Sequence, residues 1–200
     1  MQLDSSHQIV LENLNTFQKA QRCLDEVEAH LQSVLREVAD ELSALHAPLY
    51  DFKVDNDGST YLQTRAFPNM DNTGAHLITI GIERLTSTDL LGLANPEATR
   101  AYIYSELLND PKRATNYPNM VNILRQLTPP DGFLAAAPQM HGYLFVKQLA
   151  PVPVPTVCSR TLLKSFFRQT LDVLTSWLIT NTPQLSSLAG EKPSTPVISV

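Results

Sequence analysis

The sequence predicts an α+β protein, in which an antiparallel sheet of four to six strands carries long N-terminal and C-terminal helices packed together or on one sheet face. Apolar residues recur every seven positions through residues 6–46, and a second helical apolar stripe runs through residues 156–180. Between them, apolar and polar residues alternate over residues 76–85, as in a half-buried strand. A composition of 43% hydrophobic and 18% charged residues is typical of a chain with one core.

The first predicted element is one amphipathic helix over residues 6–46. Neither Gly nor Pro interrupts it before Pro48, and Ser5 with Gln8 resembles a capping box at its start. Polar residues occupy three companion positions of its apolar seam, so the helix is not an ideal leucine zipper. The stripe still predicts an interaction surface, which consists of Val10, Leu14, Phe17, Leu24, Leu31, Leu35 and Val38.

This helix is longer than one small body can cover. About forty residues at 1.5 Å each extend roughly 60 Å, whereas a compact chain of 200 residues is roughly 40–45 Å across. The helix must therefore kink near residues 13–16, project alone, or pair with a second copy or a partner helix. Internal and external uses are compatible, with half of the stripe buried in the body and half facing a partner.

Three strands are predicted to follow the helix. Residues 50–54 and 59–67 form a hairpin, because Asp-Asn-Asp-Gly at 55–58 has the chemistry of a tight turn. Residues 76–85 form the third strand, with isoleucines on its buried face.

The rest of the chain is predicted to continue with two helices, a strand and a last helix. Asn and Pro at the cap and first positions favour a helix over residues 95–108, although the Tyr-Ile-Tyr within it favours a strand. The other predicted elements are a helix at 120–127, a buried strand at 141–149, and a helix at 156–180. The predicted organisation is a helix over 1–46, a body over 47–180 and a disordered tail over 181–200.

Charge and composition disfavour several classes of protein. The net charge of −5 is that of residues 1–46 alone, and no cluster of Lys and Arg suits nucleic acid. No apolar run is long enough to span a membrane, and the first residues lack the features of a secretory signal. Cys23 and Cys158 are too far apart for a disulfide framework, which favours reduced, buried thiols in a cytoplasmic protein.

Catalytic patterns are weak in this sequence. Asp51, Asp55 and Glu83 are acids on or near the predicted strands, but a nuclease motif needs Lys two residues after Glu83, where a leucine stands. His76 and His141 each open an apolar strand and could serve as acid and base if those strands were neighbours. No metal site or cofactor is predicted, since phosphate-binding glycine patterns and metal-ligand spacings are absent from the sequence.

Two functions are therefore predicted. The first is a non-catalytic interaction or regulatory module that forms a homodimer or binds a partner helix as in a coiled coil, with the acidic face of the helix available to a basic partner. In one variant the sheet also forms a small-molecule pocket. The alternative is a small hydrolase, either a phosphodiesterase or a metal-dependent nuclease, that uses the five acids and histidines named above.

Overall fold

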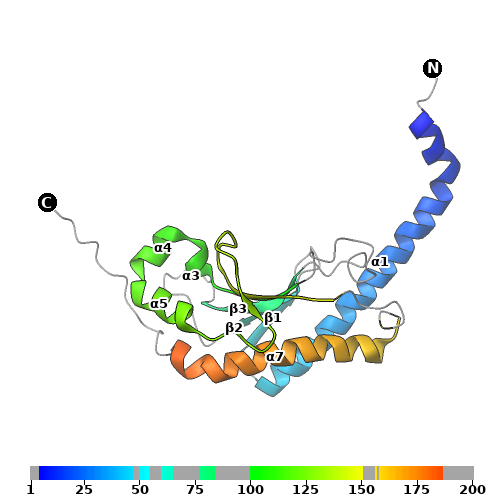
Figure 1. The fold of residues 1–200 in the computed structure, drawn as a ribbon. Coiled ribbons are helices and arrows are strands. Elements are labelled where there is room, and N and C mark those ends of the chain that lie inside the picture. The colour runs from blue at the N-terminus through cyan, green and yellow to red at the C-terminus, as the bar shows by residue number, and fades with distance from the viewer. Residues whose placement is uncertain are drawn as a thin grey trace.

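The computed structural model confirms the α+β fold class (Figure 1). In the part of the chain that the structure describes, six strands form one antiparallel sheet in the order β1-β2-β3-β4-β6-β5. The structure describes residues 5–46, 50–54, 60–64, 77–83, 100–150, 156 and 158–186.

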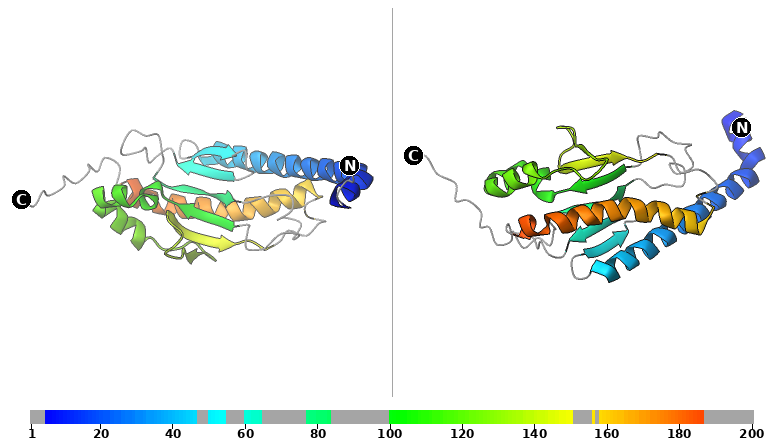
Figure 2. Two further views of the ribbon diagram at one scale, coloured as in Figure 1. Left: turned by 90° about the horizontal axis from the view of Figure 1, so that it is seen from above. Right: turned by 60° about the horizontal axis from the view of Figure 1, so that its bottom comes forward.

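The strands and helices alternate in blocks along the chain. The strands are β1 Tyr50–Val54, β2 Thr60–Thr64, β3 Thr79–Glu83, β4 Arg100–Tyr104, β5 Leu134–Ala135 and β6 Tyr143–Gln148. The helices are α1 Ser5–His46, α3 Glu106–Asn109, α4 Pro111–Asn116, α5 Pro118–Gln126 and α7 Arg160–Ser186. The two long helices lie side by side across one face of the sheet, and the three short ones gather at one end (Figures 1 and 2).

The core lies between the sheet and the two long helices. Alternating residues of β3 and β4 point to these helices, and Ile80 is directly opposite Ile103. α1 lies against β1, and α7 lies against both α1 and β3. The fully buried core residues include Leu31, Leu35, Val38, Leu42, Ile80, Ile82, Ile103, Met120, Phe167, Leu171 and Leu174.

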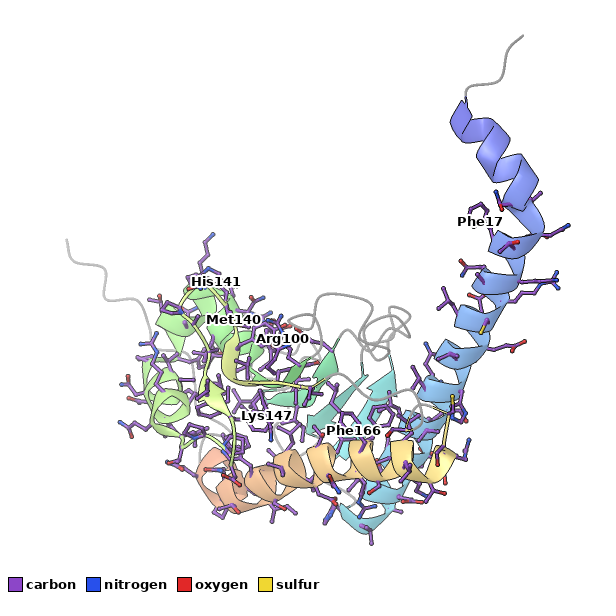
Figure 3. All side chains as sticks on the ribbon, turned by 45° about the vertical axis from the view of Figure 1, so that its right-hand side comes forward. Phe17, Arg100, Met140, His141, Lys147 and Phe166 are labelled. Atoms are coloured by element: carbon purple, nitrogen blue, oxygen red, sulfur yellow. The ribbon has the colours of Figure 1, made fainter. Side chains whose placement is uncertain are left out.

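α1 is the long helix that the sequence predicts. It is a single element of 42 residues, and its axis curves near Phe17 without interruption (Figure 3). Its C-terminal half packs into the core, whereas residues 5–26, which we term the arm, extend past the sheet (Figures 1 and 3). The sheet therefore covers only part of the helix.

The prediction of a helix over residues 95–108 is wrong for its central part. Residues 100–104 form β4, which pairs with β3 on one side and β6 on the other. The β-prone Tyr102-Ile103-Tyr104 segment prevails because two neighbouring strands supply its backbone hydrogen bonds and bury Ile103. Within the described part of this segment only α3, from Glu106, agrees with the predicted helix, and residues 95–99 lie outside the described residues.

α7 begins later and ends later than predicted. It runs from Arg160 to Ser186 and includes Pro183, so residues 181–186 are helical rather than part of the tail. A proline inside a helix removes one backbone hydrogen bond. Leu185 is fully buried, and this packing holds the last turn despite Pro183. The remainder of the predicted tail lies outside the described residues.

Both cysteines differ from the prediction of buried thiols. Cys23 lies in the arm and Cys158 precedes α7, and both are free and exposed.

The acidic residues of α1 are partly neutralised within the chain. Lys164 Nζ on α7 donates to Glu37 Oε1 at 2.7 Å and to Glu41 Oε1 at 2.5 Å. Arg160 Nη2 donates to Glu37 Oε2 at 2.6 Å, and Arg168 Nη1 contacts Glu41 Oε2 at 3.4 Å. These acids therefore join α1 to α7 and are less available to a basic partner than the sequence suggests.

This ion-pair cluster predicts how stability depends on pH. Hydrogen bonds from Lys164 and Arg160 lower the pKa of Glu37 below its ordinary value of 4.5, and hydrogen bonds to Glu37 and Glu41 raise the pKa of Lys164 above 10.5. The contribution of Glu37 is thus present above pH 4.5 and lost as the pH falls through its lowered pKa. The contribution of Lys164 is present below pH 10.5 and lost as the pH rises through its raised pKa.

We expect Lys164→Met to lower the melting temperature at neutral pH, with a smaller difference at high salt because the pairs are partly exposed. The measurement is thermal unfolding by circular dichroism between pH 3 and pH 11. Lys112→Met, on α4 and outside the cluster, is the matched control. Equal effects of the two substitutions at low salt would contradict the assigned role of the cluster.

Candidate interaction site

The arm of α1 presents apolar side chains to solvent. Its side chains from Asn13 to Cys23 are all exposed, including Leu14 at 43% and Phe17 at 50% of their full accessibility. Leu24 is half-buried. Because Leu14, Phe17 and Leu24 are spaced three and seven residues apart, they form one stripe along the arm.

The same stripe continues into the body, where its side chains are buried in the core instead of exposed to solvent. Leu31, Leu35 and Val38 belong to the predicted interaction surface, but their exposures are 1%, 1% and 0% within the chain's own core. These three residues are therefore core residues and not a free surface. Val27 is half-buried and packs against the core, so the boundary between body and arm falls next to it.

Local interactions support the helical state of the arm. The arm extends a helix that the core already holds, so it avoids the unfavourable step of starting a new helix. Gln21 Nε2 also donates to Asp25 Oδ1 at 2.7 Å, one turn further along. The arm is thus a preformed helix with an apolar stripe. The side chain of Val10 lies outside the described part of the chain.

A second group of polar and aromatic residues lies on the sheet face opposite the long helices. Arg100 Nε donates to Glu83 Oε1, and Tyr143 Oη donates to Glu83 Oε2 at 2.7 Å. The guanidinium carbon of Arg100 is 4.9 Å from the centre of the Tyr143 ring. The rings of Tyr102 and Tyr104 meet the Tyr143 ring edge-on, with centres 5.6 Å and 5.3 Å apart. This cluster ties β3, β4 and β6 together.

Two tyrosines of this cluster have altered acidity. Burial, together with its hydrogen bond to Glu83, raises the pKa of Tyr143. Burial and the nearby carboxylate of Glu106 raise the pKa of Tyr104 to about 12. The raised pKa values mean that both hydroxyls ionise only at a higher pH than an ordinary tyrosine, and the Tyr143 hydroxyl donates to Glu83. Sequence reasoning missed this cluster because residues 100–104 were assigned to a helix, where Tyr102 and Tyr104 would not share a face.

Of the five residues proposed for a hydrolase, the three that the structure describes, Asp51, Glu83 and His141, are not brought together. Asp51 is opposite Gln63 on β2, which is opposite Thr79 on β3. At about 3.3 Å per residue, Glu83 lies roughly 13 Å further along β3. His141 is exposed in the loop before β6, several strands away from Asp51. Asp55 and His76 lie outside the described residues.

The described residues contain neither a metal cluster nor a membrane-spanning helix. No three His, Cys, Asp or Glu side chains among them are close enough to hold a metal ion. No helix within the described ranges combines the length and hydropathy that crossing a bilayer requires.

The fold and these two groups of residues define an α+β protein with a projecting amphipathic arm. Comparison with protein-family models, curated proteins and solved structures finds no match to this chain. Its function must therefore be inferred from its own residues.

Proposed function

We propose that this protein is a non-catalytic interaction module that self-associates through the arm of α1. The observation that supports this most strongly is the change in burial along one apolar stripe. Leu31 and Phe17 occupy equivalent positions two heptads apart, yet Leu31 is 1% exposed and Phe17 is 50% exposed. A second copy of the arm would cover the exposed half of the stripe as the sheet covers the buried half.

The charges of the arm permit a second copy as the partner. The arm contains two bases, Lys19 and Arg22, and three acids, Glu12, Asp25 and Glu26, which leave a net charge of −1. Two arms therefore repel each other only weakly at physiological salt. The more acidic part of α1 would repel its own copy, but there Glu37 and Glu41 pair with α7.

The size of the stripe sets the expected strength of the dimer. Burying a large apolar side chain contributes about 1.5–3 kcal/mol when it was fully exposed, and association costs about 4–15 kcal/mol in lost freedom of motion. Leu14, Phe17 and Leu24 from each copy therefore support a reversible dimer rather than a permanent one. Reversible pairing suits a regulatory module, whose state then depends on its concentration.

Shortening the chain tests this proposal. Deletion of residues 1–26 removes the arm and leaves Val27 and every core residue named above in place. We expect the full chain to sediment as a concentration-dependent dimer. The shortened chain should be a monomer with nearly the same melting temperature. A full chain that stays monomeric at all concentrations in sedimentation velocity would refute self-association.

A double substitution provides the matched control. Leu14→Ala with Phe17→Ala should weaken the dimer, because alanine keeps the helix but removes the apolar contact. Asn15→Ala with Thr16→Ala changes exposed residues away from the stripe and should leave the dimer unchanged. If both pairs of substitutions gave the same dissociation constant, the stripe would not be the contact.

A further inference from the structure

A cavity of about 580 Å³ lies between the loop joining β5 to β6 and the short helices α3, α4 and α5. Its apolar lining includes Leu108, Leu124, Met140 and Phe145. Met140 and His141 lie next to each other in that loop, at the end of the molecule that the short helices occupy (Figure 3). The volume falls within the range of about 300–1,000 Å³ that is usual for small-molecule sites.

Among the residues that line the cavity, Arg125 from α5 is the one with a permanent charge, and no aspartate or glutamate is present. His141 from the loop also lines the cavity. Both side chains are exposed, so their polar ends are accessible. Among the described residues no carboxylate pairs with Arg125. An anion in the cavity would therefore gain a guanidinium partner without displacing an existing ion pair.

The wall of the cavity is held in place by the sheet. Ser105 N–H donates to the Gly142 carbonyl at 2.8 Å, and Ala136 N–H donates to the Leu144 carbonyl at 3.0 Å. Within the loop itself, Met140 N–H donates to the Ala137 carbonyl at 2.8 Å, and Tyr143 N–H donates to the Met140 carbonyl at 3.2 Å. These bonds fix the loop against β4 and β6, so the cavity is formed before any ligand enters.

We propose that this cavity binds a small organic anion with an apolar body, such as an aromatic or branched carboxylate. The apolar lining takes the body of the ligand, and Arg125 binds the anionic group through its planar pair of N–H donors. His141 supplies a further donor at the rim. The site is separate from the arm, so its occupation does not depend on self-association.

A pair of fluorescent probes tests this proposal on the full chain. Anilinonaphthalene sulfonate has an apolar body and one negative charge, and N-phenyl-1-naphthylamine has the same body without the charge. We expect one molecule of the anionic probe to bind per chain. We expect Arg125→Gln to lower the affinity for the anionic probe by about three- to tenfold, because only the anion binds the guanidinium. The affinity for the neutral probe should not change.

Three further variants locate the bound probe. Ala114→Trp places a large side chain in the cavity lining and should abolish binding of both probes. Lys112→Gln removes a charge from the same helix outside the lining and should change neither affinity. Leu14→Ala with Phe17→Ala tests whether the probes bind to the exposed stripe of the arm instead. This double substitution should change the affinity for neither probe. Circular dichroism establishes that each variant is folded.

Two results would overturn the proposal. If the affinity of the anionic probe is the same in the parent chain, Arg125→Gln and Ala114→Trp, the cavity is not its site. If Ala114→Trp abolishes binding while Arg125→Gln affects neither probe, the cavity takes apolar molecules and the assignment of an anion is wrong.

Discussion

Replacing Phe167 by alanine is expected to lower the free energy of unfolding by about 3–5 kcal/mol, the usual cost of removing a buried aromatic ring. Phe167 is fully buried and is the largest such side chain in the described core. It belongs to the core cluster that α7 shares with α1 and the strands. Alanine would leave a cavity that close-packed neighbours fill only in part.

Phe166 is the matched control for this change. It is the preceding residue of the same helix, half-buried, and its ring meets that of Phe167 edge-on at 5.6 Å. Phe166→Ala should cost about 1–2 kcal/mol, since less apolar surface returns to water. Urea unfolding followed by circular dichroism measures both losses. Similar losses for the two variants would mean that α7 does not present Phe167 to the sheet.

Gly142→Ala is expected to be the most damaging substitution of a small residue. Gly142 has φ +84°, in the left-handed region that side chains rarely adopt. A Cβ atom at this position would lie 2.2 Å from Cε2 of the Tyr104 ring. The backbone strain costs about 1–2 kcal/mol, and moving a packed ring adds about 1–3 kcal/mol. We expect a loss of about 3 kcal/mol in urea unfolding.

Gly132→Ala separates the effect of backbone strain from the effect of the clash with the Tyr104 ring. Gly132 has φ +74°, but its Cβ would meet only the mobile end of the Lys147 side chain, with Nζ at 3.0 Å. This substitution should therefore cost only the backbone strain, about 1–2 kcal/mol. Removing the ring with Tyr104→Ala should be less harmful in the Gly142→Ala background than in the parent chain. If the losses of unfolding free energy from Gly142→Ala and Tyr104→Ala were strictly additive, the Tyr104 ring would not be what the added Cβ atom clashes with.

Periodic patterns predicted most of the fold. The seven-residue repeat predicted α1, the alternation of isoleucines predicted β3, and the apolar stripe predicted α7, because each pattern extends over many residues. β4 was missed because its cap signals favoured a helix, whereas the pairing with β3 and β6 decides its structure. A single sequence does not show which strands will be neighbours.

The two candidate sites differ in how far the sequence anticipates them. Leu14 and Phe17 belong to a visible repeat, so the arm was predicted as an interaction surface. Arg125 and His141 are 16 positions apart in the sequence without a shared motif. They line one cavity only because α5 and the loop before β6 meet at the same end of the sheet.

The residues alone determined that the chain begins with one long amphipathic helix and that this helix exceeds the reach of a small body. The tertiary structure alone decided where along that helix the stripe passes from core to surface. Leu31 and Phe17 have equivalent positions in the repeat. They differ in burial because the sheet and α7 cover the C-terminal half of α1 and not the arm. The width of a sheet depends on strand pairing between distant segments, and no local pattern within the helix encodes it.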